Sequence, residues 1–420
     1  MTINRHYVLA AGGTGGHMMP AFALGAELLR RGHHVALVTD ERGLKIPGCP
    51  DKIVTHVLPA GRMTGGPLGW LRSASAIGRG REMAKQLYSS FGPSAVIGFG
   101  GYPAFPALLG AFANKVPTII HEQNAVLGRV NRLTASKVNA IVTAYPDIQR
   151  LKPRDKEKVH LLGNPVRAEV LALRSEAFPP LDENGIFRVL VTGGSQGASI
   201  LSEVVPDGLA RLPVSLRRRL QVTQQCREED IAFVRKSYSD HQIPAELATY
   251  LPDLPERLGW AHLVISRAGA STIAELTCAG RPAILIPLPS AMDNHQAYNV
   301  TEMVHAGGAR ALAQLPITTK VIGDDASDRT NALRRERSAA VDKMSRALAK
   351  QIQSIALKPD ALENAARAAH KCGRPEAVND LADLVESFGA APIVKPLKVA
   401  AENSGGFGAA SPALAKERSA

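Results

Sequence analysis

A short pattern that occurs twice constrains the fold of this chain more than any other feature. An apolar run leads into a glycine-rich loop of the form GG[T/S]xG at residues 8–16 and again at residues 189–197, 181 positions later. Glycine permits a tight turn after a buried strand, and a helix-forming segment follows each loop. The repeat predicts two α/β units that each open with a strand, a glycine loop and a helix.

Short apolar runs alternate with amphipathic segments along most of the chain, which predicts parallel sheets with helical connections. We expect two doubly wound domains, residues 1–165 and 166–374, with a linker in residues 166–185, where Pro179 and Pro180 break the periodicity. The expected strands are residues 6–11, 34–38, 53–58, 95–99, 117–121, 139–143, 187–192, 263–266 and 282–287, and the expected helices include 20–31 and 128–136.

The C-terminal part differs in composition. Residues 321–358 are helix-prone and rich in both charges, which favours a solvent-exposed helical insertion. From Gly389 onward Ala, Pro, Gly and Ser dominate. We expect residues 389–420 to be disordered, because their few large apolar side chains cannot offset the entropy lost on ordering.

The formal charge of +12 is concentrated in the first part of the chain. Residues 1–165 carry 20 Lys and Arg against 9 Asp and Glu, or +11; residues 166–320 carry 15 against 16, and residues 321–420 carry 15 against 13. An anionic partner, whether nucleic acid, membrane or phosphorylated substrate, should therefore meet the first domain. Residues 66–85 mix apolar and basic side chains at helical spacing, so they form either a helix packed on the sheet or a surface that docks on anionic lipid.

Cysteine usage and hydropathy predict the compartment. The four cysteines, Cys49, Cys226, Cys278 and Cys372, are too far apart in sequence for a disulfide framework or a zinc motif, which fits a reducing compartment. The N-terminus shows no signal-peptide pattern, and prolines and glycines interrupt the long uncharged stretch at residues 86–114. We expect a cytosolic protein without transmembrane helices.

The first glycine loop, residues 12–17, reads Gly-Gly-Thr-Gly-Gly-His. It matches neither the dinucleotide fingerprint nor the Walker A loop, but the N–H groups at the start of the following helix can bind an anion. The alternative is a tight turn without a ligand. His17 falls in the first helical turn, where the helix dipole favours a neutral imidazole suited to general-base catalysis. The alternative is a capping or packing histidine.

Further polar segments follow strands at the same expected sheet edges, where doubly wound folds bind ligands. Arg167, near the domain junction, could neutralise a diphosphate, and Glu275 could accept hydrogen bonds from a ribose. Glu275 alternatively belongs to a capping box with Thr272. No metal-ligand constellation is visible, since Asp324 and Asp325 lie in the charged C-terminal region. A diphosphate leaving group would then be stabilised by helix N-termini and arginine.

Together these segments closely resemble the MurG glycosyltransferases of bacterial peptidoglycan synthesis. The resemblance covers about residues 5–315 and a final helix near residues 375–388. The sequence departs from the family pattern at residues 224–227, and the region 321–358 and the tail exceed the usual length. The matching motifs, in the family's order, are GGTGGH at residues 12–17, GGYP at 100–103, HEQN at 121–124, GNPVR at 163–167, GGSQGA at 193–198, SRAGA…E at 266–275 and HQ at 295–296.

The resemblance implies a GT-B fold, in which two Rossmann-like domains face a cleft and the C-terminal helix crosses back to the first domain. It implies an inverting hexosyltransferase that moves N-acetylglucosamine from UDP-GlcNAc to the C4 hydroxyl of undecaprenyl-pyrophosphoryl-MurNAc-pentapeptide (lipid I), forming lipid II. It implies no cofactor and no metal requirement. The implied place is the cytoplasmic face of the bacterial inner membrane, as a peripheral protein on anionic lipid, with a part in cell shape and division and contacts to cell-wall and division proteins.

The resemblance also implies site residues by motif position. His17 is the candidate catalytic base. The implied donor contacts are Thr14, Gly15, Gly16, Asn124, Arg167, Ser195 and Gln296, with Leu251 near the uracil and Ala270, Ser271, Thr272, Ile273, Ala274 and Glu275 around uridine and ribose.

Two other classes remain as alternatives. A related GT-B enzyme, such as a diacylglycerol glycosyltransferase or a sugar-nucleotide epimerase, would not be expected to retain the motifs at residues 121–124 and 163–167. A basic nucleic-acid-binding protein is disfavoured, because the basic half has scattered charge and no recognition-helix pattern. We therefore expect no nucleic acid among the partners.

Overall fold

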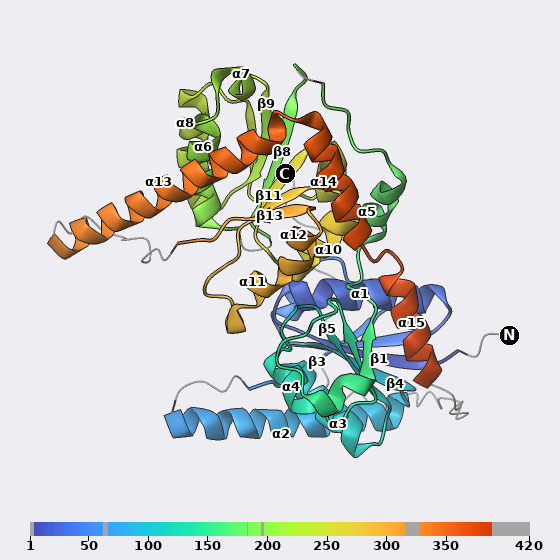
Figure 1. Cartoon of the computed structure of the whole chain (residues 1–420). Coiled ribbons are helices and arrows are strands. Elements are labelled where there is room, and N and C mark those ends of the chain that lie inside the picture. The colour runs from blue at the N-terminus through green and yellow to red at the C-terminus, as the bar shows by residue number, and fades with distance from the viewer. Residues whose placement is uncertain (1–3, 62–65, 183, 195–196, 316–327, 389–420) are drawn as a thin grey trace, which may run out of the picture.

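A computed structural model of the chain describes residues 4–61, 66–182, 184–194, 197–315 and 328–388. These residues form two α/β lobes, each built on one parallel sheet, as Figure 1 shows. The first sheet has the strand order β3-β2-β1-β4-β5-β6-β7. Its strands are β1 (His6–Ala11), β2 (His34–Thr39), β3 (Val54–Val57), β4 (Ala95–Gly100), β5 (Thr118–Glu122), β6 (Ala140–Thr143) and β7 (Val159–Leu161).

Both faces of the first sheet are covered by helices. Along β1, Tyr7 and Leu9 enter one buried cluster while Val8 and Ala10 enter another on the opposite face. Burial on both faces explains why the strand reads as a continuous apolar run without polar alternation. The helices of this lobe are α1 (Gly15–Arg30), α2 (Gly66–Phe91), α3 (Ala104–Ala113) and α4 (Arg129–Thr134).

The second sheet has the strand order β10-β9-β8-β11-β12-β13. Its strands are β8 (Phe187–Thr192), β9 (Leu220–Gln225), β10 (Ala245–Ala248), β11 (Leu263–Ser266), β12 (Ala283–Leu285) and β13 (Ala309–Ala311). The helices after the first lobe are α5 (Ala168–Ala172), α6 (Ser199–Ala210), α7 (Val214–Arg217), α8 (Ile231–Asp240), α9 (Leu254–Trp260), α10 (Ala270–Cys278), α11 (His295–Asn299), α12 (Thr301–His305), α13 (Asp328–Ala356), α14 (Pro359–Cys372) and α15 (Ala377–Phe388). Short 3-10 helices are η1 (Gly43–Lys45), η2 (Pro153–Lys158), η3 (Leu173–Ser175), η4 (Glu228–Asp230) and η5 (Met292–Asn294).

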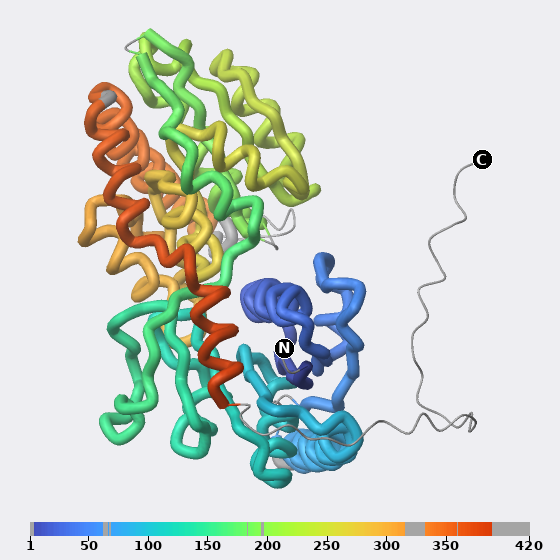
Figure 2. Tube along the Cα trace, turned by 90° about the vertical axis from the view of Figure 1, so that its right-hand side faces the viewer, coloured from blue at the N-terminus to red at the C-terminus, as the bar shows by residue number. Residues whose placement is uncertain are grey.

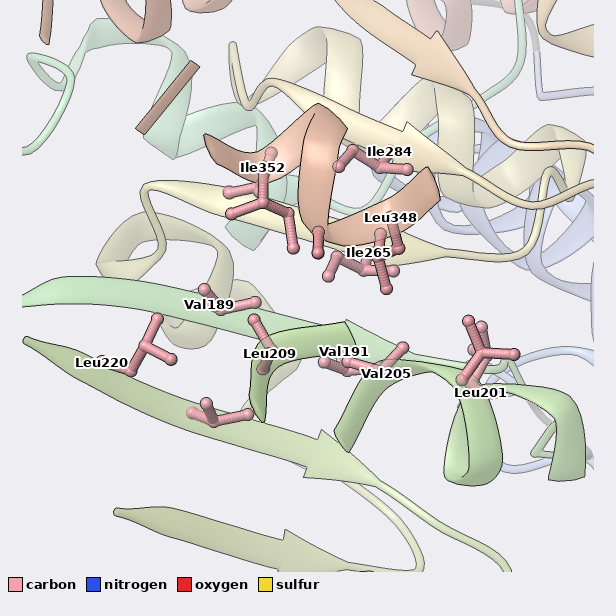
Figure 3. Close-up of a cluster of buried hydrophobic side chains, with 14 of the residues drawn as sticks. Val189, Val191, Leu201, Val205, Leu209, Leu220, Ile265, Ile284, Leu348 and Ile352 are labelled. Atoms are coloured by element: carbon pink, nitrogen blue, oxygen red, sulfur yellow. The ribbon is translucent and has the colours of Figure 1, made fainter. Parts of the chain in front are cut away.

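The long charged helix α13 differs from the solvent-exposed insertion expected for residues 321–358. Its Met344, Leu348, Ile352 and Ile355 are buried and belong to the core of the second lobe. Figure 3 shows Leu348 and Ile352 beside side chains of the second sheet. The side chains of one helical face recur every four residues here, so the second half of α13 packs on the domain while its other face carries the charges. Residues 321–327 and 389–420 lie outside the described part of the chain.

Helix α15 lies against the first lobe, although it follows the second lobe in sequence. Figures 1 and 2 show it descending from the upper lobe to lie beside α1. Its Leu381 and Val385 are buried in the same cluster as Leu24 and Leu28 of α1. Polar contacts add to this packing, since His33 Nε2 lies 2.7 Å from Glu386 Oε1. The chain therefore crosses between the lobes twice, and the proposed domain bounds remain predictions.

The linker expected at residues 166–185 is partly ordered against the second lobe. Val166, Val170 and Leu173 are buried in a cluster with side chains of β8 and β11. Among the described helices, none is both long enough and apolar enough to cross a bilayer.

Candidate active site between the two domains

The glycine loops of the first lobe meet at the carboxyl edge of its sheet. Strands β1 and β4 are neighbours there, and the strand order reverses direction between them. A Cβ atom on Gly101, whose φ is +80°, would lie 2.4 Å from the carbonyl oxygen of Gly12, and a Cβ on Gly12 would lie 2.4 Å from Pro103 Cγ. The two loops interlock so closely that a side chain at either glycine would force the backbone apart.

His17 lies in the first turn of α1 beside the second glycine loop. Its Nδ1 is 3.1 Å from the carbonyl oxygen of Gly12 and 3.3 Å from Thr14 Oγ1. Because a carbonyl only accepts hydrogen bonds, Nδ1 carries the proton and Nε2 keeps its lone pair. A Cβ atom on Gly100 would lie only 3.2 Å from that Nε2. The imidazole ring therefore occupies space that is free because residue 100 has no side chain.

The surroundings of His17 favour the neutral imidazole. Burial lowers its pKa below the ordinary value of 6.5, the hydrogen bond to Gly12 opposes that shift, and the electrostatic influence of His295 lowers the pKa further. His295 belongs to α11 of the second lobe, so this electrostatic influence on His17 comes from the other domain. A neutral imidazole with an available Nε2 is the form that can accept a proton.

Thr14, Gly15 and Gly16 form the start of α1, which begins at Gly15, five residues before the expected helix at residues 20–31. Thr14 is the N-cap residue, and its carbonyl accepts the N–H groups of His17 and Met18. The N–H groups of the first helical residues have no carbonyl partner one turn earlier, so they can serve an anion. The structure therefore places Thr14, Gly15 and Gly16 at the start of a helix, where free N–H groups are available.

Arg167 and Glu275 contact each other. The Nε and Nη2 atoms of Arg167 lie 3.0 and 2.8 Å from Glu275 Oε1. Burial raises the pKa of the Glu275 carboxyl, while the adjacent guanidinium opposes that shift. The capping-box alternative for Glu275 is wrong, because α10 begins at Ala270 with Gly269 as its N-cap. The pair brings the cation and the carboxylate expected for a nucleotide sugar to one place.

The remaining residues of the uridine and ribose segment differ in accessibility. Ile273 and Leu251 are buried in the core of the second lobe, so their side chains do not reach the surface. Ala270 packs against Ala125 and Tyr145 of the first lobe. Ser271 has a buried Oγ without a hydrogen-bond partner among the described residues, and Thr272 and Ala274 are partly exposed.

Gln296 is positioned by its own loop. Its Oε1 accepts the N–H of Leu288 at 2.9 Å, so the amide NH₂ group is the end of this side chain that can donate to a ligand. The expected donor contact Ser195 lies outside the described residues. Neighbouring Gly194 has a φ of +76°, as the tight turn after β8 requires.

Asn124 contacts the second lobe through Asn299, a residue that the sequence analysis did not identify. Asn299 of α11 is fully buried. Its Nδ2 donates to Asn124 Oδ1 and to the carbonyl of Ala268, both at 3.1 Å, and its Oδ1 accepts the N–H of Ala125 at 2.8 Å. Asn299 follows Gln296 by three residues, so helical spacing from the HQ motif was the available signal.

The buried carboxylate of Glu122 holds Asn124 in turn. Glu122 Oε1 accepts the backbone N–H of Asn124 at 3.1 Å, and Oε2 accepts the N–H of Gly128 at 2.7 Å and Asn131 Nδ2 at 2.9 Å. Burial raises the pKa of Glu122, and these hydrogen bonds oppose the shift. Within the described part of the chain no group of three or more His, Cys, Asp or Glu side chains could hold a metal ion.

Comparisons with known proteins identify the fold and the family of the chain. The model of the glycosyltransferase family 28 N-terminal domain matches residues 7–143, and that of the family's C-terminal domain matches residues 188–358. A solved structure of Acinetobacter baumannii MurG aligns with a TM-score of 0.68 at 24% identity, over 91% of this chain and 99% of that one. A UDP-GlcNAc 2-epimerase from Neisseria meningitidis, bound to UDP-GlcNAc, aligns with a TM-score of 0.55 at 14% identity over 91% of this chain and 100% of that one. The chain is thus a glycosyltransferase with the GT-B fold.

Curated relatives give the narrower family. Proteins from Erythrobacter litoralis and Novosphingobium aromaticivorans are each 61% identical to this chain, over 96% and 95% of it and over 94% and 96% of their own lengths. Both carry the name UDP-N-acetylglucosamine–N-acetylmuramyl-(pentapeptide) pyrophosphoryl-undecaprenol N-acetylglucosamine transferase. The chain belongs to this family, the MurG glycosyltransferases of glycosyltransferase family 28, as its motifs predicted.

Proposed function

We propose that the chain transfers N-acetylglucosamine from UDP-GlcNAc to the C4 hydroxyl of lipid I, with inversion, to give lipid II for peptidoglycan. The names of relatives that are 55–61% identical support the substrates. The observation that carries the mechanism is the placement of His17 on one domain and the Arg167–Glu275 pair on the other, with Asn299 joining the two domains. Transfer between two substrates requires that the two domains hold the reacting groups at a fixed distance and orientation.

His17 is the base in this proposal. Its Nε2 takes the proton of the acceptor hydroxyl as that oxygen attacks the anomeric carbon from the face opposite the nucleotide. The new C–O bond forms while the bond from the anomeric carbon to the UDP oxygen breaks, and the electron pair leaves with UDP. The hydrogen bond from Nδ1 to Gly12 holds the imidazole in the tautomer that this step requires.

The leaving diphosphate is stabilised by the protein's own dipoles and cation. Thr14, Gly15 and Gly16 offer the N-terminus of α1, Ser195 belongs to the second glycine loop, and Arg167 supplies the positive charge. Glu275 accepts hydrogen bonds from the ribose through the oxygen that Arg167 does not contact, Gln296 donates from its amide, and the segment at Leu251 lies near the uracil. On this proposal no metal or other cofactor is required.

The first domain would be the membrane-facing one. Trp70 and Leu71 of α2 are 59% and 68% exposed, and Arg72, Arg79 and Arg81 follow on the same helix. Exposed apolar side chains next to cations suit an interface with anionic lipid. We propose a peripheral enzyme on the cytoplasmic face of the inner membrane, acting in cell shape and division, where contacts with cell-wall and division proteins would occur.

The test is a transfer assay with the full chain. Radiolabelled UDP-GlcNAc and a short-chain lipid I analogue are incubated with chelator and without added metal, and product is separated from donor. Transfer to the lipid I analogue is the expected result. Full activity on unrelated acceptors with none on lipid I would contradict the proposed acceptor, and activity restored only by a divalent cation would contradict metal independence.

A further inference from the structure

A strained turn lies next to Gln296 and has no part in the chemistry described above. Asp293 and Asn294 have φ angles of 54° and 55°, in the left-handed region of backbone conformation that residues other than glycine seldom adopt. Asp and Asn tolerate this region better than most residues. Strain of this kind persists where surrounding contacts hold it, and it concentrates at functional sites.

The contacts that hold this turn come from the other domain. Asp293 Oδ2 lies 2.9 Å from Arg132 Nη2, and Asp293 Oδ1 lies 3.2 Å from Arg150 Nη2. Arg132 belongs to α4 of the first lobe, and Arg150 follows β6. The side chains of Asp293 and Arg132 are 18% and 25% exposed, so this ion pair is partly shielded from water, while Arg150 is 52% exposed. Each carboxylate oxygen therefore has its own arginine across the domain junction.

The turn and the candidate donor residue form one unit. The N–H of Asn294 donates to the carbonyl of Ala291 at 2.8 Å, and His295 Nδ1 donates to the carbonyl of Met292 at 2.8 Å. Gln296 Oε1 closes the loop by accepting the N–H of Leu288. A displacement of Asp293 would therefore displace His295 and Gln296 with it.

We propose that Asp293 is a positioning residue for the transfer reaction, which fixes the Gln296 loop of the donor domain against the first domain through Arg132 and Arg150. The inference rests on the proposed function. Asn299 is the second anchor of the same segment, six residues further on, and both anchors bind the first lobe. The distance from the donor sugar to His17 is thereby set by a segment that contacts neither reacting atom.

This role predicts a particular kinetic signature. On the proposed function, UDP is held mainly by Arg167, Glu275 and the glycine loops, none of which the Asp293 ion pairs contact, so loss of these pairs should leave the dissociation constant for UDP within about twofold. Transfer requires the acceptor oxygen and the anomeric carbon at reactive separation, so turnover falls when the domains are held loosely. A residue that only stabilises the fold would lower the melting temperature and leave the turnover of the folded enzyme unchanged.

The variant Asp293→Asn tests the inference, because asparagine keeps the left-handed preference and removes the charge. The matched control is Glu203→Gln, whose carboxylate also pairs with an arginine, Arg337, and is 21% exposed, but within the second domain. We expect Asp293→Asn to lower kcat with saturating UDP-GlcNAc and lipid I analogue by roughly tenfold or more, with Glu203→Gln within about twofold of the wild type. Equal kcat for the two variants, or a loss of UDP affinity as large as the loss of kcat, would overturn the proposal.

Arg132→Gln removes the same ion pair by changing its other partner. This second variant keeps the test valid if Asp293→Asn folds poorly. We expect a kcat decrease in the same direction with unchanged UDP binding. The double variant Asp293→Asn/Arg132→Gln should be within about twofold of Asp293→Asn, because the pair is already lost. Additive losses would overturn the shared role. Absence of transfer by the wild-type chain would contradict the proposed function instead, so the two failures are distinguishable.

Discussion

The two glycine loops share a sequence pattern and differ in what surrounds them. In the first domain, Gly12 and Gly101 are packed against each other's loop, and His17 lies over Gly100. In the second domain, a Cβ on the equivalent Gly193 would lie 2.6 Å from the backbone nitrogen of Ala198 in the same loop, while a Cβ on Gly194 would have no atom of the described residues within 4 Å. The repeated strand, loop and helix thus build both folds. In the first domain a second loop packs over it and forms a closed corner beside His17, while in the second domain the loop keeps open space at Gly194 and forms an open cradle.

The largest effect is expected for His17→Ala in the closed corner. Turnover should fall by about 10² to 10⁴, the usual contribution of a general base, and UDP affinity should stay within about twofold. Radiolabel transfer and UDP titration measure the two quantities. His241→Ala, which removes an exposed histidine of the second domain, is the control. Unchanged turnover in His17→Ala would remove this residue from catalysis.

The pH profile sharpens the same assignment. His17 must be neutral to accept a proton, and partial removal from water, with a smaller contribution from His295, holds its pKa below the ordinary value of 6.5. Turnover should therefore stay level above pH 6.5 and decline as the pH falls through the lowered pKa. His295→Gln removes one cause of the lowering and should move the acid limb to higher pH. A limb that stays in place would contradict the electrostatic link between the domains.

The packing difference between the loops predicts unequal stability losses. Gly101→Ala meets the Gly12 carbonyl at 2.4 Å and should lower the free energy of unfolding by about 3 kcal/mol. Gly194→Ala also has a positive φ but no close atom among the described residues, so about 1 kcal/mol is expected. Urea unfolding of both variants measures the difference, and equal losses would refute the interlocking of the first pair of loops.

Glu275→Ala tests the open cradle of the second domain. The KM for UDP-GlcNAc should rise by about tenfold, because a charged hydrogen bond to ribose contributes roughly 1.5–3 kcal/mol, while kcat changes little. Glu169→Ala removes an exposed carboxylate two residues from Arg167 and serves as the control. A change in kcat with an unaltered KM would make the ribose assignment wrong.

The smallest effect concerns the charge difference between the domains. Binding to vesicles that contain anionic phospholipid should weaken several-fold in Trp70→Ser and should decrease as salt is raised. Phe233→Ser is the matched control, since Phe233 is 57% exposed on the nearly neutral second domain. Vesicle binding that is independent of salt, or equally reduced in both variants, would contradict the basic docking surface.

The sequence predicted the strands of both sheets except β7, β9, β10 and β13, which are short or polar. Strands β7 and β13 have three residues each, and β9 ends in Gln224 and Gln225. These glutamines are buried because Tyr238 Oη donates to Gln224 Oε1 and Thr192 Oγ1 donates to Gln225 Oε1. Such partners lie on other elements, so no local pattern reveals them. The buried face of α13 could have been recognised from the helical spacing of its apolar residues, but the high charge of the segment led us to predict a solvent-exposed helix.

The motifs predicted which loops meet, since adjacent parallel strands end at one sheet edge. They could not predict contacts made between domains. Asn124 and Asn299 are 175 positions apart, and Arg132 and Asp293 are 161 apart. Each pair depends on how one domain is set against the other, which no single-domain periodicity encodes.

Helix α15 has a consequence for how the protein is made. Its Leu381, Ala382 and Val385 complete the core of the domain that is synthesised first. A nascent chain emerges from the ribosome N-terminus first, so the apolar strip of α1 that includes Leu24 and Leu28 lacks its α15 partner until all of the second domain has been translated. During that interval the strip is exposed to chaperones and to other nascent chains. Helix α15 thus sets the moment at which the first domain can finish folding.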